Sequence, residues 1–361
     1  MNGVPSLSSL SSSTTTTDEV NNRRQEKEVE RYRFNSEILK RVRECRHNDN
    51  YHGVIEWAQD WLVIALSTYA SLSAFRYLAW PLALPIYLFA IFLIGGRQRA
   101  LADILHQAAH GTLLKNRRAA DFFGTVLSGY LVLQSLSGYR FSHVVRHHGF
   151  LGDTTLDPDY EQYREWKICG ANLTAAAVRR HLLRTLTPAS TLNYIKYLLK
   201  HRIFPQTENS RERVFRISFV AIVTILICSF GYAHLLLFYW LIPLVTTQAW
   251  IGAFLELVEH YPMIETQRTF DIYMSRNRRC SWLSSFLLGL KQYDGYHLVH
   301  HTFPFIPSWR LPEAHRIMVE DANYNSMNQV YGWKGMLQTI LNPERSSSFK
   351  LDSVGDLEVY Q

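Results

Sequence analysis

Residues 61–96 read WLVIALSTYASLSAFRYLAWPLALPIYLFAIFLIGG, and Arg76 is the only charged residue among these 36. A helix needs about 20 mostly apolar residues to span a membrane, so this run is long enough for two rather short spans joined at Arg76. Pro81 and Pro85 are expected to kink or shorten the second helix. A buried hairpin of a soluble protein would carry a polar face at helical spacing, whereas these residues are apolar all round. The stretch therefore predicts a membrane hairpin.

A second run has the same character. Residues 217–255 contain no Asp, Glu, Lys or Arg, and Gly231 is placed for a turn and Pro243 for a kink. Together the two runs predict an all-α, polytopic membrane protein with four transmembrane helices in two hairpins, capped by a cytoplasmic helical domain. Lys and Arg gather before, between and after the hairpins, so both termini and the middle segment are expected to face the cytoplasm. The net charge of +7 then fits an anionic membrane surface or an acidic partner rather than nucleic acid.

The remaining segments complete the predicted organisation. Residues 1–22 are polar, rich in Ser and Thr and without the pattern of a secretory signal, and they predict a disordered N-terminal tail. Residues 23–57 predict cytoplasmic or membrane-surface helices, residues 58–320 the membrane domain, and residues 321–361 a cytoplasmic C-terminal helix and tail. The four cysteines form no CxxC pair, which argues against a disulfide scaffold or a thiolate metal site.

Three histidine-rich motifs flank the apolar runs. They are HQAAH (His106, His110), HVVRHH (His143, His147, His148) and HLVHH (His297, His300, His301). Positions i, i+3 and i+4 share one face of a helix, so each motif can direct two or three imidazoles at one point. In the middle motif this spacing groups His143 with His147 and leaves His148 one step round the helix. Neutral imidazole is a common ligand of Zn, Cu, Fe and Ni, so the motifs predict a metal site.

The number of histidines narrows the choice of metal. Eight of the chain's 15 histidines lie in the motifs, which is more than one tetrahedral zinc uses. No motif contains the glutamate of the HExxH pattern of zinc hydrolases. A site with two metals and nitrogen ligands points to iron before zinc. The charge-free run 122–139 separates the first two motifs, so we expect it to be interfacial or re-entrant, because a crossing would place the motifs on opposite membrane faces.

The three motifs, in this order and separated by two apolar hairpins, resemble the histidine boxes of the membrane fatty acid desaturase superfamily over residues 55–320. The middle box is HxxxHH here, one residue longer than the common HxxHH. The resemblance implies a further ligand at the cytoplasmic end of the fourth span, the position of His260 in LELVEHYP. It also implies that these histidines hold two non-heme iron ions, that O2 is a co-substrate, and that a lipid acyl chain (fatty acyl or sphingolipid) is desaturated.

The resemblance also implies partners and a location. Electrons must come from an external donor such as cytochrome b5 or a ferredoxin, and the sequence shows no HPGG-type heme segment. A basic cytoplasmic surface suits an acidic donor. The membrane is expected to be that of the endoplasmic reticulum, with the termini and the active site on the cytoplasmic side.

Carboxylates near the boxes are candidates to support the ligands. Asp103, Asp157 and Glu256 are placed to accept the second imidazole N–H of a ligand, and Glu256 to reach the metal site itself or through water. Asp153 and Asp159 lie close to Asp157 in the sequence, and Glu259 lies close to Glu256, so they are candidates for the same role. The alternative interpretation is helix capping in LDPDY and ordinary surface charge.

Two other functions fit parts of the pattern. A diiron hydroxylase or ketolase acting on a lipid or carotenoid would use the same boxes. A metal-binding membrane transporter would need ionisable side chains in the middle of its spans, and the apolar runs carry almost none. Histidines without box spacing, such as His234 and His315, are not expected to be ligands.

Overall fold

The computed structural model describes residues 29–197, 199, 207–266, 270–291, 294–326 and 329–342. The predicted tail at residues 1–22 lies outside these residues. Within them the chain is helical, apart from a small parallel ladder in which β1 (Asn277–Arg279) pairs with β2 (Gln329–Tyr331), and an isolated bridge. The all-α class is therefore confirmed.

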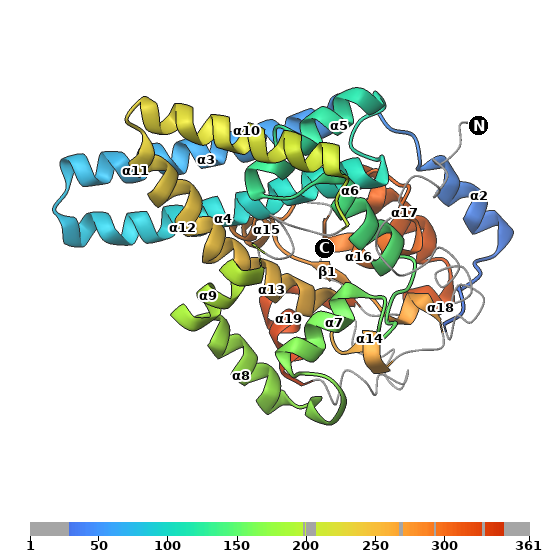
Figure 1. The fold of residues 1–361 in the computed structure, drawn as a ribbon. Helices are drawn as coiled ribbons and strands as arrows, with labels where there is room; N and C mark the ends of the chain where they lie inside the picture. The colour runs from blue at the N-terminus through green and yellow to red at the C-terminus, as the bar shows by residue number, and fades with distance from the viewer. Residues whose placement is uncertain are drawn as a thin grey trace.

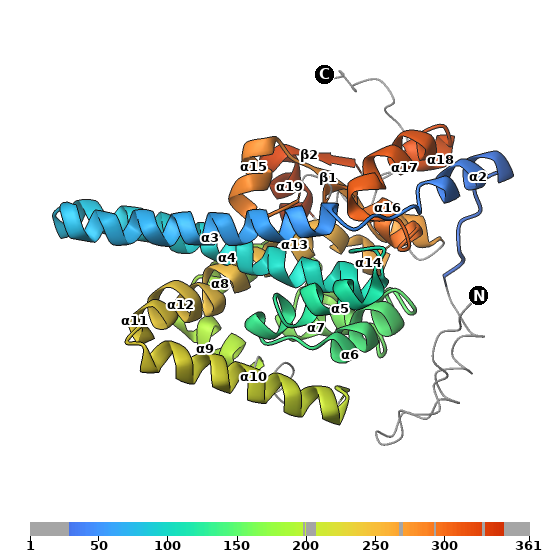
Figure 2. The ribbon, with the colours of Figure 1, turned by 90° about the horizontal axis from the view of Figure 1, so that it is seen from above.

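The first apolar run folds into a long helical hairpin. Its arms are α3 (His52–Tyr77) and α4 (Trp80–His110), which lie side by side and project from the rest of the molecule (Figures 1 and 2). The turn falls at Leu78 and Ala79, directly after the predicted position at Arg76.

The prolines do not shorten the second arm, contrary to expectation, because α4 runs uninterrupted over 31 residues. Pro81 lies in the first turn, where an N–H has no intrahelical partner. Pro85 removes only the bond that would return to the carbonyl of Pro81. The helix ends at Gly111, whose φ of 78° is the left-handed conformation that glycine adopts without strain.

The second apolar run also forms a hairpin, but its returning arm is interrupted. The outgoing arm is α10 (Ser210–Ser229), and the return consists of α11 (Ala233–Leu236), the π-turn η6 (Leu237–Leu241), α12 (Ile242–Val245) and α13 (Thr247–His260). The break falls at Thr246, three residues after Pro243, where a kink was predicted. The Thr247 hydroxyl there donates to the carbonyl of Ile91 (2.7 Å), which fixes α13 against α4.

Residues 122–139 form short segments rather than one spanning helix. These are the end of α5 (Arg117–Thr125), the 3-10 turn η2 (Gly129–Val132) and α6 (Leu136–Tyr139). The indoles of Trp57 and Trp240 donate hydrogen bonds to the carbonyls of Leu127 and Leu131. Irregular backbone packed on protein in this way is the arrangement predicted for the run.

The other elements form a cap at one end of the two hairpins (Figure 1). They are α2 (Ser36–Glu44), η3 (Arg140–His147), α7 (Pro158–Trp166), η4 (Gly170–Asn172), α8 (Ala175–Thr185), α9 (Pro188–Tyr197), α14 (Met263–Thr266), η7 (Asp271–Tyr273), α15 (Trp282–Leu288), η8 (Asp294–Tyr296), α16 (His297–Thr302), η9 (Ser308–Arg310), α17 (Leu311–Met318), α18 (Ala322–Asn325) and α19 (Gly332–Leu341). Met336 and Ile340 of α19 share a buried cluster with Leu257 of α13. The predicted segment boundaries at 23–57, 58–320 and 321–361 stay predictions.

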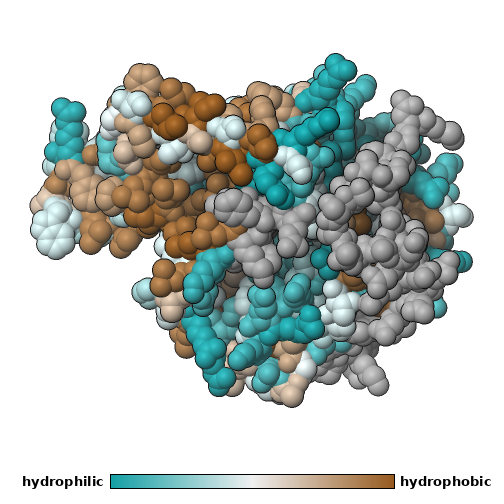
Figure 3. Space-filling model, viewed as in Figure 1, coloured by the Kyte–Doolittle hydropathy of each residue, from teal (hydrophilic) through white to brown (hydrophobic). Residues whose placement is uncertain are grey.

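The projecting hairpins are apolar on their outside. Figure 3 shows hydrophobic residues over this part of the molecule and hydrophilic residues over the cap. By length and composition, two described helical stretches are suited to cross a membrane, namely residues 80–110 and 233–260. Large apolar side chains such as Leu62, Leu88 and Ile225 are more than half exposed.

Candidate metal centre

The first box lies at the cap end of α4. One helical turn separates His106 from His110, so both imidazoles leave the helix on the same side. The Nε2 atom of His106 lies 2.9 Å from the Nε2 atom of His300 on α16. The first and third boxes, almost 200 residues apart in sequence, therefore meet.

The middle box forms a π-helix, η3, in which N–H groups bond the carbonyl five residues earlier. The His148 N–H accordingly donates to the His143 carbonyl (2.9 Å). This wider turn brings the Nε2 atoms of His143 and His148 to 3.1 Å, while the Nε2 atom of His147 lies 3.3 Å from that of His301. The expected grouping of His143 with His147 is wrong, because α-helical spacing does not apply here. The π-turn accommodates the extra residue of HxxxHH.

The third box meets the end of α13. His260 is the last residue of that helix, and its Nε2 atom lies 2.9 Å from the Nε2 atom of His297. The carbonyl of Met274 can only accept, so the Nδ1 of His260, 3.1 Å away, carries the proton. The Nε2 lone pair of His260 is therefore directed toward the other imidazoles.

The nine predicted histidines fall into two adjoining groups. In the first group the ligating nitrogens lie within 4.8 Å of one another, and its members are His106, His110, His143, His148 and His300. In the second group His147, His260 and His301 meet the same limit, and His297 adjoins through His260. The structure thus brings together every histidine that the sequence pattern selected.

Carboxylates contact the far side of two of these imidazoles. Asp103 lies 3.1 Å from Nδ1 of His106, and Asp157 lies 3.0 Å from Nδ1 of His147. Asp159 approaches the same Nδ1 at 2.9 Å. Asp157 also caps α7 by accepting from the Asp159 N–H, so this residue combines helix capping with its contact to His147.

Glu256 has a different position from the one expected of a supporting carboxylate. Its Oε1 accepts a hydrogen bond from the hydroxyl of Tyr163 (3.0 Å), and its carboxylate lies within 4.8 Å of ligating atoms of Asp159 and His260. It borders the second group, and among the described residues no imidazole Nδ1 forms a hydrogen bond with it. Sequence reasoning missed Tyr163 and the Met274 carbonyl, since nothing in the local sequence marks either one.

Burial sets the protonation of the cluster. It lowers the pKa of His143, His148, His297, His300 and His301 well below the ordinary histidine value, and neighbouring imidazoles lower it further. A lowered pKa favours the neutral imidazole, the form whose lone pair can bind a metal ion.

His147 is the exception. Burial alone would lower its pKa as well, but the charges of Asp159 and Asp157 raise it well above the ordinary value. A cation bound at its Nε2 would be compensated by the same carboxylates.

The donor set fits metal ions. The Nε2 atom of His110 is buried and has no hydrogen-bond partner among the described residues. Buried polar atoms are rarely left unpaired, so this lone pair needs an occupant that the polypeptide does not supply. Neutral imidazoles without thiolates suit iron, zinc or copper.

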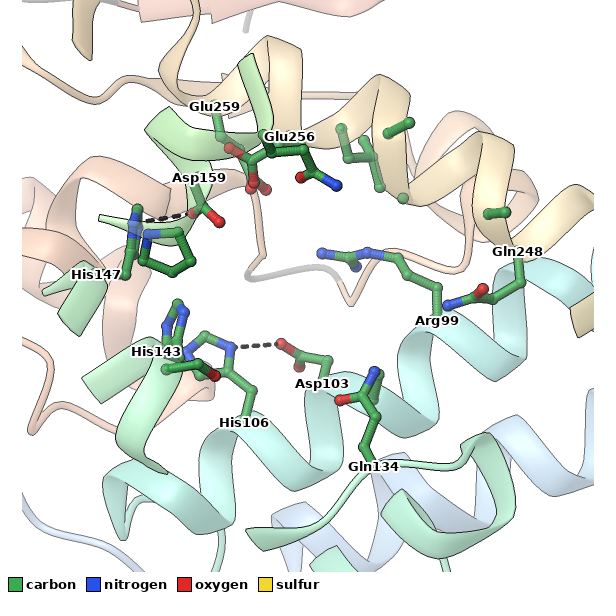
Figure 4. Close-up of a pocket in the computed structure, with 18 of the residues that line it drawn as sticks. Arg99, Asp103, His106, Gln134, His143, His147, Asp159, Gln248, Glu256 and Glu259 are labelled. Carbon is green, nitrogen blue, oxygen red and sulfur yellow. Dashed lines mark hydrogen bonds and ion pairs between the residues drawn. The ribbon is translucent and has the colours of Figure 1, made fainter. Parts of the chain in front are cut away.

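A cavity of about 1730 Å³ adjoins both histidine groups. It lies between α4 and α13 and is also lined by residues of α7, α8 and α9. In Figure 4, His106, His143 and His147 lie at one end of this space, with Asp103, Arg99, Glu256 and Gln248 along its walls. A substrate in the cavity would therefore reach the metal centre directly.

Comparison with known proteins defines the class. Residues 78–333 match the family described as fatty acid desaturase, and the chain belongs to this family. It is a desaturase-family oxidoreductase, which agrees with the resemblance drawn from the three boxes.

Two curated relatives extend the comparison. The chain is 34% identical over 310 residues to a dihydrorhizobitoxine desaturase of Bradyrhizobium elkanii, covering 84% of this chain and 85% of that protein. It is 28% identical over 249 residues to a protein of Caenorhabditis elegans described as "Putative sphingolipid delta(4)-desaturase/C4-monooxygenase", covering 68% of this chain and 60% of that protein.

Proposed function

We propose that this protein is a membrane-bound, non-heme diiron desaturase that uses O2 and external electrons to introduce a double bond into a lipid chain. The observation that carries the proposal is the convergence of nine histidines in two adjoining groups, with carboxylates behind His106 and His147. Membership of the desaturase family supports the same chemistry.

Each histidine group would hold one iron. The first group offers five imidazoles and the second four, which is more than a single tetrahedral zinc uses. Asp103 and Asp157 would fix the orientation of His106 and His147 and raise their basicity, and the Met274 carbonyl would do the same for His260. These contacts hold the ligating Nε2 atoms in place before a metal arrives.

The iron ions, when bound, would supply the activation of O2 and the removal of two hydrogens from neighbouring unactivated carbons. Reduction of O2 to two waters takes four electrons and four protons. The two substrate C–H bonds supply two electrons and two protons, the external donor supplies two electrons, and solvent supplies two protons, so that the products are a C=C bond and two waters. The polypeptide's part is to place the CH2–CH2 unit in the cavity beside the histidines and to limit access of bulk water.

The electron donor is proposed to dock on the cap. Cytochrome b5 or a ferredoxin is acidic enough to be attracted by a basic surface, and α8 presents Arg179 and Arg180 exposed and away from the cavity. Reversing the charge of Arg179 and Arg180 should slow reduction by such a donor and weaken its salt dependence. Equal rates for the variant and the parent would remove this surface from the proposal.

The membrane arrangement is proposed to consist of four spans, α3, α4, α10 and the α11–α13 arm, with the cap and both termini in the cytoplasm. The exposed apolar side chains of both hairpins support it, as does the gathering of basic residues outside the hairpins. An endoplasmic reticulum membrane is the proposed location.

Product analysis tests the function. The protein should be expressed in a host with simple lipids, and the acyl chains and sphingoid bases analysed by mass spectrometry. Desaturation predicts products that lack a pair of hydrogens, in an O2-dependent manner. Unchanged lipids with a fully metal-loaded protein would contradict the proposal for lipid substrates.

A hydroxylase is the second candidate, because the name of the Caenorhabditis elegans relative includes a C4-monooxygenase activity. The same mass spectra separate the two reactions, since hydroxylation adds oxygen and keeps the C–C single bond. A carotenoid hydroxylase or ketolase would differ in substrate but also add oxygen. A metal transporter is disfavoured, because the histidines gather in the cap instead of lining the spans.

A further inference from the structure

The cavity beside the histidine groups has a polar wall, formed by Arg99, Gln134, Gln248 and Glu256. Figure 4 shows Arg99 reaching into the space from α4, with Glu256 and Gln248 on the facing helix α13 and Gln134 below them. A site for a plain hydrocarbon chain would be lined by apolar side chains, because buried polar groups lose their hydration there without compensation.

Among the residues of the polar wall, Gln134 gives the strongest evidence for a bound ligand. It is only 8% exposed, and its side-chain carbonyl oxygen, Oε1, is buried and has no hydrogen-bond partner among the described residues. The preceding residue, Leu133, has a φ of 63°, a left-handed conformation that is unfavourable for a residue with a β-carbon. Leu133 ends the 3-10 turn η2 and presents Gln134 to the cavity, where a donor group of a ligand can satisfy the unpaired Oε1.

Arg99 and Gln248 offer further donors. Arg99 donates one hydrogen bond, from Nη1 to Asp294 (3.0 Å). Gln248 accepts from the hydroxyl of Tyr194 (3.0 Å), which leaves the N–H groups of its amide for a ligand. These donors complement an oxygen-bearing group such as a hydroxyl or a carboxylate.

Glu256 places a hydrogen-bond acceptor on the facing wall of the cavity, opposite the donors of Arg99. Among the described residues no Lys or Arg forms an ion pair with it, and its carboxylate accepts a hydrogen bond from the hydroxyl of Tyr163. A carboxyl oxygen accepts a hydrogen bond from an amino group whether the acid is ionised or not. An amino group of the substrate is therefore the complement of this wall.

We propose that the substrate carries an oxygen-bearing group held by Arg99 and Gln134 and an amino group held near Glu256, both within a few bonds of the carbons that are oxidised. The inference rests on the proposed function and narrows its substrate. The chemistry is shared by the head group of an amino-alcohol lipid and by a free amino compound, and a cavity of about 1730 Å³ admits either.

The test compares two buried glutamines in the iron-loaded, full-length protein. Gln134→Leu removes the unpaired amide from the cavity wall. Gln98→Leu is the matched control, because Gln98 is also buried with an unpaired Oε1 but does not line the cavity. The probes are sphinganine as an amino-alcohol lipid, norleucine as a free amino compound, and stearoyl-CoA as a plain acyl chain. Calorimetry measures binding, and product analysis measures turnover.

We expect sphinganine or norleucine to bind about tenfold more weakly to Gln134→Leu, the effect of one lost hydrogen bond to a buried group. The affinity of Gln98→Leu should be unchanged, and the probe that responds identifies the source of the amino group. Binding of neither amino probe, or equal binding by parent and Gln134→Leu, would overturn the inference.

Failure of the inference is distinguishable from failure of the proposed function. If stearoyl-CoA is desaturated with the same KM by the parent and Gln134→Leu, and in preference to the amino probes, the inference falls and the function stands. If an amino probe binds in a Gln134-dependent manner but none of the three probes is oxidised, the binding inference stands and the proposed function falls.

Discussion

His300 occupies the point where the three boxes meet, with its Nε2 atom 2.9 Å from that of His106 and 3.1 Å from that of His148. Removing its imidazole takes one metal-ligating nitrogen from the first group and leaves a gap between the remaining imidazoles. We predict that His300→Ala abolishes oxidation and lowers the iron content while the chain stays folded. Metal analysis and product analysis of the purified variant provide the measurement.

A buried histidine outside the cluster provides the control. His315 bonds the hydroxyl of Tyr324 (2.8 Å) and lies in neither histidine group, in agreement with its exclusion from the ligands. His315→Ala should lose stability but keep a normal iron content per folded chain. Full activity of His300→Ala would remove His300 from the proposed ligands.

Asp157 permits a separate test of the carboxylates. In Asp157→Asn the side chain can still cap α7, since asparagine is as good a cap as aspartate. The variant loses the negative charge beside Nδ1 of His147, so we predict metal binding weaker by about 10–100-fold, as for other residues that support a ligand. Asp153→Asn, which alters an acceptor outside the two groups, should bind metal normally in the same titration.

We also predict that His315 makes the stability of the fold depend on pH, independently of any metal. Burial lowers its pKa to about 4, below the ordinary value of 6.5. The unfolded chain therefore binds a proton more readily, so this contribution to stability is complete above pH 6.5 and is lost as the pH falls toward 4. His315→Gln should show a shallower decline of stability over this window in acid unfolding curves. Identical slopes would contradict the assignment.

At the scale of elements, the close contact between α4 and the loop after α15 holds the third box near the first. Gly289 has a φ of 66°, and a β-carbon there would overlap the carbonyl of Gly96. We predict that Gly289→Ala destabilises the fold by about 1–3 kcal/mol, the cost of a strained backbone position, and lowers metal affinity. Thermal unfolding and metal titration provide the readouts.

Gly252 on α13 is the matched control, because a β-carbon there meets nothing within 4 Å. An Ala in a helix is favoured over Gly by about 0.5–1 kcal/mol, so Gly252→Ala should be neutral or stabilising. A Gly289→Ala protein as stable as the Gly252→Ala protein would show that the approach of α15 to α4 tolerates a side chain.

The two hairpins were predictable because long charge-free runs leave few alternatives to paired apolar helices. The π-turn of η3 was not, because the spacing of HVVRHH is equally compatible with an α-helix and only the surrounding contacts select the wider turn. The break at Thr246 was predicted only as a kink at Pro243. The polar wall was missed because Arg99, Gln134 and Gln248 come from three separate segments and show no common spacing.

At the scale of the whole molecule, the proposed membrane arrangement has the tips of both hairpins on the side of the membrane opposite the metal centre. A loop with an Asn-X-Ser glycosylation acceptor, inserted at Gly231, should be modified in microsomes. The same loop inserted at Asn50, before α3, should stay unmodified. The reverse pattern would invert the proposed orientation, and modification at both positions would contradict the hairpin arrangement.

The nine histidines were predictable at this scale because topology and motif order act together. His260 required the family resemblance, since a single histidine at a helix end carries no spacing signal of its own. Asp103 and Asp157 were predictable from their distance in sequence to a box. The roles of Tyr163 and the Met274 carbonyl depend on tertiary contacts that no local pattern encodes.

The central claim is that the nine histidines hold two iron ions in one protein chain. Iron and zinc in the purified, full-length protein should be quantified together by elemental analysis, with His300→Ala and His315→Ala prepared in parallel. We predict two irons per chain in the parent and in His315→Ala, and a clear loss of iron in His300→Ala. A single zinc per chain, or iron content unaffected by His300→Ala, would contradict it.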